Sequence, residues 1–448
     1  MITTARARSI CRKVMEIGGK RKLEVLLSAE DGGLTRFANN AIHQNVSASD
    51  TSVSIRAMRG KKSARVNTNR LDSESLKEVV ERAFDLAKIQ EPNPDALPLP
   101  AAQRYRSVRS YFKATAAFGP AERAAAVRKA VTVCKKRGAS AAGAFSTQAN
   151  LVAVANTRGL FAAGRATVSS LSLTAELDTG AGWAEAVATD VSRIDPAWVA
   201  SRAASKARAS RKAKRFEPGK YTVILEPAAV GDLVLMLGYY SDGFNAMAYL
   251  EKRSPFSGKL GRRVLGANFT LTEDPFHRLL PGWGFDLEGM PRKRVPLIEK
   301  GVLKGLVHDR VTAKKIKTRS TGHAGLQPAP NGPSVSSLVL EPGKSTLEDM
   351  IRRSERAILV THFHYTNMVD ISKLVATGMT RDGTFLIENG KVTHPIRNMR
   401  FTQSLTEAFS NILDVGRNQV LSEGFFGGGV VTPAMRMKDF TFSSETAF

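Results

Sequence analysis

Two histidines separated by one residue, His362 and His364, are the first candidates for chemistry in this chain. The apolar residues 357–361 before them predict a strand, and alternate residues of a strand face the same side. Both imidazoles are therefore expected on one face, where they could bind a metal ion. The alternative is that they line a cleft or pack beneath a loop. Three residues are candidates for a third metal ligand: His323, Glu388 and His394.

Other catalytic motifs are absent from the sequence. No HExxH or HExxxH pattern offers two imidazoles and a glutamate on one helix. There is no GxSxG nucleophile elbow and no P-loop. Ser320 lies near His323, but a Gly/Pro-rich loop is a poor setting for a serine nucleophile. The two cysteines, Cys11 and Cys134, have no metal-ligand spacing, which excludes a disulfide framework and is typical of a reducing cytoplasm.

The composition points to a basic protein that is not a membrane protein. The net charge is +25, from 66 Lys and Arg against 41 Asp and Glu, and such an excess could attract nucleic acid or acidic partners. No apolar run reaches the length of a membrane span, and the N-terminus lacks the features of a signal peptide. We therefore expect a cytoplasmic protein with no membrane contact.

Positive charge gathers in one segment, residues 201–216, SRAASKARASRKAKRF. The pattern of residues 195–216 predicts a helix with Lys and Arg on every side, and such helices commonly bridge domains. We interpret residues 201–217 as a connector, with a nucleic-acid-binding arm as the alternative. The 448 residues exceed one ordinary domain, so the chain is expected to hold an N-terminal domain, residues 1–200, and a C-terminal domain, residues 218–448.

The predicted N-terminal domain is an antiparallel sheet with packed helices. Alternating apolar residues predict strands, and a turn is expected at residues 31–33, where two glycines follow an aspartate. Asp72 or Ser73 can cap a helix that ends before the proline-rich residues 91–94. The expected helices are residues 4–18, 72–88 and 120–137, and the expected strands are residues 23–28, 51–58, 62–67, 141–150, 151–157 and 164–178.

The predicted C-terminal domain is rich in hairpins and has few helices, so the fold class is α+β. Asn389 and Gly390 between two strand-like runs indicate a tight hairpin, because a type I′ turn needs positive φ at both central residues. A further turn is expected at residues 381–383. The expected strands are residues 220–226, 268–274 and 336–340 and a hairpin at 295–308; the expected helices are residues 227–238, 310–317, 346–353 and 404–415.

The segment around the paired histidines closely resembles the C-terminal region of the TldD/PmbA (TldE) family. Its most specific part is GMTRDGTFLIENG, residues 378–390. The segments SVSIRAMRGKKSARVNTNRLDSESLKEVVERAFDLAK and RSPFSGKLGRRVLGANFTLTEDP are similar to the family's N-terminal domain and middle region. The resemblance covers nearly the whole chain from Leu23 onward.

The resemblance implies a link to zinc-dependent proteolysis of unfolded or extended peptides by a heterodimer. In that family the TldD-type subunit carries zinc through HExxxH and a distant cysteine, whereas the PmbA/TldE-type subunit lacks this motif. The corresponding segment of this chain reads PAAVGDLVLMLGYYSDG, residues 227–243, and contains neither histidine nor cysteine. The chain therefore resembles the PmbA/TldE type, and peptidase activity of the chain alone is in doubt.

We therefore expect a subunit that binds no zinc itself and completes the substrate chamber of a zinc-bearing TldD-like partner; a homodimer is the alternative assembly. The expected ligand is an unfolded peptide, and the resemblance suggests five chamber-lining residues: His364, Tyr365, Arg381, Asp382 and Gly383. Two other functions stay open: an autonomous metallopeptidase that uses His362 and His364, with His394 as a further ligand, and a basic modulator associated with nucleic acid or gyrase.

Overall fold

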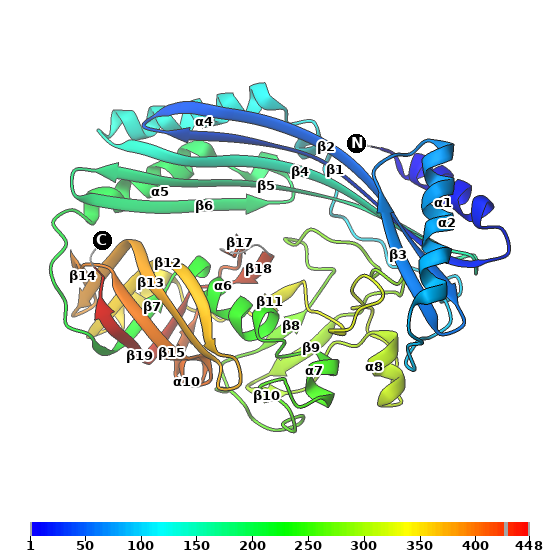
Figure 1. Cartoon of the computed structure of the whole chain (residues 1–448). Helices are drawn as coiled ribbons and strands as arrows, with labels where there is room; N and C mark the ends of the chain where they lie inside the picture. The colour runs from blue at the N-terminus through cyan, green and yellow to red at the C-terminus, as the bar shows by residue number, and fades with distance from the viewer. Residues whose placement is uncertain (1, 425–428, 447–448) are drawn as a thin grey trace.

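The N-terminal part of the chain is one long antiparallel sheet of six strands in the order β3-β2-β1-β4-β5-β6. The computed structural model describes residues 2–424 and 429–446. This sheet lies across the top of Figure 1, with the C-terminal part of the chain beneath it. Its strands are β1 (Lys22–Ala38), β2 (Ala41–Arg59), β3 (Lys62–Thr68), β4 (Ser140–Asn156), β5 (Phe161–Leu177) and β6 (Gly180–Ala188).

The predicted turn at residues 31–33 is wrong, because β1 continues through it to Asn39 and Asn40, where φ is positive and the chain reverses. Gly33 is required for packing instead. A Cβ atom on Gly33 would lie 2.2 Å from Nη2 of Arg123, a buried side chain of the helix above. A glycine inside a strand commonly marks such a close approach.

Helices cover the N-terminal sheet at both of its ends. They are α1 (Thr4–Gly18), α2 (Ser73–Ile89), α3 (Lys113–Ala116), α4 (Pro120–Lys136) and α5 (Pro196–Ala209), with a 3₁₀ turn, η1, at Val191–Arg193. As predicted, Asp72 caps α2 by accepting a hydrogen bond from the Ser75 N–H. α1 and α2 form one apolar core with β1, β2 and β4, and α4 and α5 form a second core with β4, β5 and β6. Cys134 is buried in this second core.

Helix α5 corrects the prediction of a helix that is polar on every side. It ends at Ala209 instead of near residue 216, and it buries a face of small residues against β5 and β6. That face is Pro196, Val199, Ala200, Ala203, Ala204 and Ala207. Its alanines are less conspicuous in the sequence than the Lys and Arg residues between them, although they fall at helical spacing on one side.

The C-terminal part contains two further sheets. The six-stranded sheet has the order β10-β9-β8-β11-β18-β17, and the seven-stranded sheet has the order β12-β7-β19-β15-β13-β14, with β16 paired to β19. An additional β12–β13 pairing closes the seven-stranded sheet on itself around buried phenylalanines. The strands are β7 (Gly219–Leu225), β8 (Leu271–Glu273), β9 (Val295–Glu299), β10 (Val302–Leu303), β11 (Leu338–Leu340), β12 (Arg356–Asp370), β13 (Val375–Glu388), β14 (Lys391–Pro395), β15 (Met399–Ser404), β16 (Ile412–Val415), β17 (Val420–Glu423), β18 (Gly429–Thr432) and β19 (Met435–Glu445).

Short helices connect these strands. They are α6 (Pro227–Leu235), continued by a π-helical turn, η2 (Met236–Tyr240), then α7 (Ala246–Leu250), α8 (Arg310–Lys315), α9 (Leu347–Arg352) and α10 (Leu405–Ser410). The predicted helix over residues 404–415 is only half correct, because β16 follows α10 at Ile412. α6 packs between the two C-terminal sheets, which explains its continuous apolar sequence. Within the described residues, no helix is long and apolar enough to cross a membrane.

The hairpin predicted at Asn389 and Gly390 is confirmed, with φ of 47° and 75° at the two positions. The turn predicted at residues 381–383 is wrong, because the chain does not reverse there. Asp382 and Gly383 form a bulge inside β13, where the pairing with β12 shifts register opposite Thr361. Gly383 has φ of 129°, a value that L-residues rarely adopt. Overall, the predicted α+β class is confirmed: an antiparallel sheet with helices, followed by a strand-rich part with few helices.

Candidate functional site

A cavity of about 330 Å³ lies where the N-terminal sheet meets the beginning of α6. Glu226 follows strand β7, and Pro227 is the first residue of α6. Proline lacks an N–H group, but at the first position of a helix this N–H would have no helical partner, so no hydrogen bond is lost. The cavity walls come from separate parts of the fold: β6, α5, the start of α6, residues 345–348 at the start of α9, residues 416–418, β17 and Ala434. Its lining residues include Trp183, Trp198, Arg202, Lys206 and Glu226, and Arg417 and Glu348 are also on the wall.

An ion cluster forms one side of this cavity. Oε2 of Glu226 accepts hydrogen bonds from Nη2 of Arg202 at 2.8 Å and from Nζ of Lys206 at 2.9 Å. Nζ of Lys206 also donates to the Trp183 carbonyl at 3.3 Å. The Glu226 and Lys206 side chains are 9% and 13% exposed, whereas Arg202 is 38% exposed. The cluster therefore ties α5 to the first residue before α6, with Arg202 as its most open member.

Burial and charge oppose each other in this cluster. Burial alone would raise the pKa of Glu226, but the positive charges of Lys206 and Arg202 outweigh it and hold that pKa below its usual value. Burial lowers the pKa of Lys206, and the carboxylate of Glu226 acts against that effect. The carboxylate is therefore ionised at neutral pH and is already compensated by two cations.

His362 and Asp382 lie at the same junction, just outside the cavity. Nε2 of His362 is 3.3 Å from Oδ2 of Asp382, which the β13 bulge points toward β12. The His362 ring stacks on Trp183 of β6, with centroids 4.3 Å apart and an angle of 17° between the planes. Asp382 also accepts a hydrogen bond from the Thr174 hydroxyl of β5 at 3.5 Å. This pair joins the closed sheet to the N-terminal sheet and supports one cavity wall through Trp183.

The other predicted chamber residues surround this pair without reaching the cavity wall. His364 follows on β12, where burial and then the nearby charges of Arg381 and His362 lower its pKa. Its ring meets Tyr365 edge to face at 4.5 Å, and Tyr365 is 56% exposed. Gly383 completes the bulge, and a Cβ there would lie 2.7 Å from the Thr361 hydroxyl oxygen. The bulge thus gathers the predicted residues at one place, although the cavity itself is built mostly from others.

The residues suggested as metal ligands are dispersed. His394 lies on β14 opposite Leu386, and Glu388 ends β13. His323 lies in a different cavity, described below. Among residues 2–424 and 429–446, no group of three or more His, Cys, Asp or Glu side chains has an arrangement that could hold a metal ion. α6 offers no imidazole or thiolate, and Glu226 beside it is compensated by two cations, so these residues do not fit a zinc ion.

A second cavity, of about 470 Å³, lies between β4 and β5 and the loops of the C-terminal part. Arg292 and His323 line its polar side, and behind them lies the fully buried Glu273, with Nη2 of Arg292 at 2.7 Å and Nε2 of His323 at 3.3 Å from its Oε1. Burial lowers the pKa of His323, and Glu273 acts against it. Nδ1 of His323 is 2.9 Å from the Thr321 hydroxyl, while the Ser320 hydroxyl donates to a backbone carbonyl. Ser320 and His323 therefore bond to other partners, in agreement with the poor setting that this loop offers a serine nucleophile.

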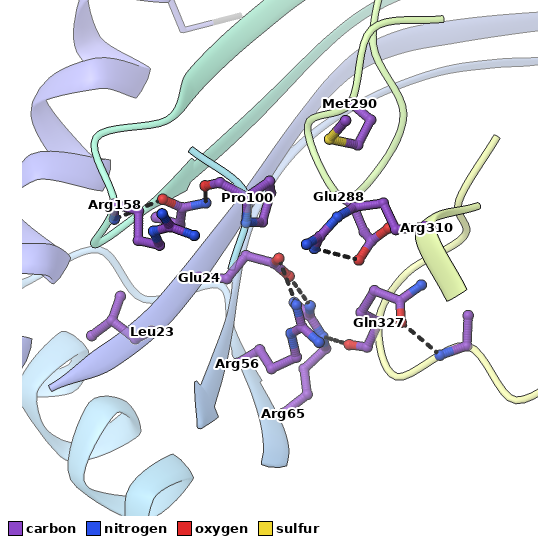
Figure 2. A network of polar contacts seen from close by, with 12 residues as sticks. Leu23, Glu24, Arg56, Arg65, Pro100, Arg158, Glu288, Met290, Arg310 and Gln327 are labelled. Carbon is purple, nitrogen blue, oxygen red and sulfur yellow. Dashed lines mark hydrogen bonds and ion pairs between the residues drawn. The ribbon is translucent and has the colours of Figure 1, made fainter. Parts of the chain in front are cut away.

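A buried polar network beyond this cavity links the two parts of the chain (Figure 2). Glu24 of β1 is fully buried and pairs with Arg56 at 2.8 Å and with Arg65 at 2.6 Å. Nε of Arg65 also donates to the backbone carbonyl of Gln327 in the C-terminal part. Glu288 faces this network from the opposite side, 3.5 Å from Nη1 of Arg310. Because a buried charge is costly without partners, the network fixes how the sheet sits on the C-terminal loops.

The sequence missed the cluster of Arg202, Lys206, Glu226, Trp183 and Trp198. One signal was present: Arg202 and Lys206 are four residues apart, so they share a helix face beside the alanine stripe of α5. No local sequence pattern predicts that this helix face contacts Glu226, because the contact depends on how α5 and β7 pack.

The chain thus combines an N-terminal antiparallel sheet with a strand-rich part that packs around the buried helix α6. A family model described as "PmbA/TldA metallopeptidase C-terminal domain" matches residues 218–444, and a second, "PmbA/TldA metallopeptidase domain 1", matches residues 23–87. The chain belongs to the PmbA/TldD family, which is metalloprotease-like.

Curated relatives and a solved structure agree with this assignment. A metalloprotease of Methanothermobacter thermautotrophicus is 25% identical over 231 residues, which are 50% of this chain and 49% of that protein. The match thus spans about half the length of that relative. Metalloprotease PmbA of Escherichia coli O157:H7 is 21% identical over 95% of this chain and 96% of its own length. The crystal structure of TldE from Thermococcus kodakarensis has the same fold, with a TM-score of 0.87 at 22% identity, covering 98% of this chain and 99% of that one.

Proposed function

We propose that this chain is the non-zinc subunit of a TldD/TldE-type peptidase assembly and that it forms part of the chamber that holds unfolded or extended peptides. The observation that carries the proposal is the ion cluster at the start of α6. In the place where the resemblance would put HExxxH, this chain has a cavity bordered by Glu226, Arg202 and Lys206. A zinc-bearing, TldD-like chain would supply the metal.

Two strand edges support the binding of an extended peptide. β6 is the last strand of the N-terminal sheet, and β17 is the last strand of the six-stranded sheet. Both contribute to the wall of the cavity at α6, β6 through Trp183 to Glu185 and β17 through Val420 to Ser422. A strand at the edge of a sheet can accept a peptide by main-chain hydrogen bonding, which is independent of the peptide's sequence. This suits a substrate chamber for unfolded chains.

The test is an assay of the purified chain on a disordered fluorogenic peptide, with and without a chelator, next to a metal analysis of the same sample. We expect no chelator-sensitive cleavage and no stoichiometric zinc. We further expect that a TldD-like chain with HExxxH forms a stable complex with this one and that cleavage by the pair exceeds that of either chain. Light scattering of the isolated chain would show whether it forms a homodimer instead.

The result that overturns the proposal is chelator-sensitive cleavage by this chain alone. The variants His362→Ala and His364→Ala then decide whether the paired histidines are responsible. If both variants abolish metal binding and cleavage together, the autonomous metallopeptidase replaces the subunit as the function. His43→Ala is the control, because His43 is an exposed residue of β2 in the N-terminal sheet and is not a candidate ligand.

A further inference from the structure

The cavity at the start of α6 has hydrogen-bond donors that the described residues of the protein do not use. A guanidinium group carries five N–H donors. Within the described part of the chain, Arg202 donates through Nη2 alone, to Glu226, and its side chain lines the cavity and is 38% exposed. Arg417 on the same wall is exposed and has no side-chain partner among residues 2–424 and 429–446.

The charges on the wall leave a positive excess. Arg202, Lys206 and Arg417 face the two carboxylates of Glu226 and Glu348. Glu185 also lines the cavity, but burial and the neighbouring Glu423 raise its pKa well above the usual value, which disfavours its charged form. The first turn of α6 adds backbone N–H groups without helix partners at the same end. An anion is therefore the charged group that this cavity can accommodate.

The remaining walls are apolar and aromatic. Trp198 is 51% exposed, and the Arg202 guanidinium lies 5.6 Å from the centre of its ring. Trp183 stands on the other side, held by the His362 ring and by a hydrogen bond from its Nε1 to Ser172. The other apolar lining residues are Ala184, Pro227, Ala228, Leu347, Val420, Leu421 and Ala434. A volume of about 330 Å³ is enough for an apolar side chain next to a small charged group.

We propose that this cavity selects peptides in which a carboxylate follows an apolar or aromatic side chain, with Arg202 as the residue that binds the carboxylate. The proposal rests on the peptide-binding function proposed above and adds a preference to it. The carboxylate can be the C-terminus of the peptide or an acidic side chain, because both present the same two oxygens to a guanidinium. Trp183 and Trp198 would enclose the neighbouring apolar side chain.

The experiment is a titration of the full chain with matched disordered peptides of about ten residues. One peptide ends in Leu-Phe with a free carboxylate, and the second is its C-terminal amide. A third and fourth are amides with Phe-Asp or Phe-Asn at the centre. Calorimetry gives the Kd, and tryptophan fluorescence in a Trp283→Phe background reports on the cavity, since Trp183 and Trp198 are then the only two tryptophans left.

We expect the free acid to bind at least about tenfold more tightly than its amide, because a charge-assisted hydrogen bond to Arg202 is lost in the amide. In Arg202→Gln this preference should fall to about twofold or less, with the amide's own Kd unchanged. Folding should persist, since Lys206 still compensates Glu226. Arg208→Gln is the matched control, because Arg208 is an exposed residue near the end of the same helix and should keep the preference.

Each remaining outcome has one meaning. Equal binding within both pairs, the free acid against its amide and Phe-Asp against Phe-Asn, removes the carboxylate preference and leaves the proposed peptide chamber standing. Failure of all four peptides to bind removes the chamber itself. A preference that survives in Arg202→Gln removes Arg202 from its role. A preference for the free acid without one for Phe-Asp over Phe-Asn assigns the cavity to C-terminal carboxylates, and the converse assigns it to acidic side chains.

Discussion

Glu288 is a buried carboxyl group whose surroundings differ strongly from water. It is 4% exposed, its Oε2 has no hydrogen-bond partner within the described residues, and its nearest cation, Arg310, is 3.5 Å away. Burial, followed by the nearby Asp286, raises the pKa of Glu288 to about 8. The folded protein therefore holds a proton at Glu288 at pH 7 that the unfolded chain has released.

The first prediction is that stability falls between pH 7 and pH 8.5 because of this carboxyl group. A folded pKa above the unfolded one means that the folded state binds more protons in this window, so raising the pH favours unfolding. The slope should approach about 1.4 kcal/mol per pH unit near pH 7 and decrease beyond pH 8. Urea unfolding at half-unit pH steps measures it, and Glu288→Gln should flatten the curve.

Glu185 acts in the same direction, because burial raises its pKa well above the usual value, and it is unchanged in Glu288→Gln. Most of the other titrating groups lie outside this window. The pKa of Asp286 is about 6, so its effect is essentially complete by pH 7. Burial lowers the pKa of His308 and His323, whose effects have the opposite sign and end near the unfolded value of about 6.5. The buried thiols become relevant above pH 8.5, since burial raises the pKa of Cys11 to about 12. A slope that is unchanged in Glu288→Gln would assign the effect to another group.

At the scale of elements, the cavity depends on the close packing of α5 against β6. Two glycines of β6, Gly180 and Gly182, let the helix backbone approach the strand directly. A Cβ on Gly182 would lie 2.3 Å from the Ala203 carbonyl oxygen and from the Ala207 backbone nitrogen. Backbone atoms cannot move aside as a flexible side chain can, so a substitution at Gly182 must lift the helix.

The second prediction is that Gly182→Ala lowers the free energy of unfolding by about 1–3 kcal/mol, the usual range for overpacking. The same shift would move Arg202 and Lys206 away from Glu226 and weaken peptide binding at the cavity. Gly32→Ala is the matched control in the same sheet, because its Cβ would meet its nearest neighbour at an ordinary 3.5 Å. We expect the control to change stability by less than about 0.5 kcal/mol. Equal stability of both variants would show that the helix does not need this glycine.

Local signals predicted single elements well and their arrangement poorly. The cap of α2 at Asp72 and the turn at Asn389–Gly390 depend on neighbouring residues, and the sequence predicted both. The closure of the seven-stranded sheet depends on β15 and β19, whose partners lie far along the chain, and neither strand was predicted. The cavity likewise joins Trp183, Arg202, Glu226 and Leu421, which no local pattern connects. The histidine pair singled out in the sequence lies at the junction that contains the cavity, but the residues of the cavity wall were not predicted.

At the scale of the whole molecule, the excess of positive charge is spread over both parts of the chain. The run expected to form a connector is only partly available to a ligand, because Lys206 is bound to Glu226 and Ser210 is buried. Five of its cationic residues are exposed: Arg208, Arg211, Lys212, Lys214 and Arg215. Long-range attraction to a polyanion depends on the total charge of +25 more than on any such run.

The third prediction follows from this distribution. The chain should bind duplex DNA weakly at about 50 mM salt and lose at least about tenfold in affinity by about 200 mM, because binding by phosphate contacts releases counterions. Changing the five exposed residues of the run to glutamine should leave most of this binding, since most of the 66 cationic residues remain. Fluorescence anisotropy of a labelled duplex at several salt concentrations gives the affinity and its salt slope.

A second set of five substitutions separates distributed charge from a dedicated arm. It neutralises exposed residues at the far end of the N-terminal sheet: Lys20, Lys22, Arg59, Lys77 and Arg82. If attraction is distributed, both sets lower the affinity and the salt slope by similar amounts, because they remove the same charge. If only the set at residues 208–215 abolishes binding, the run is a nucleic-acid arm. The comparison is decisive because net charge is identical in the two variants, so only the location of the charge differs.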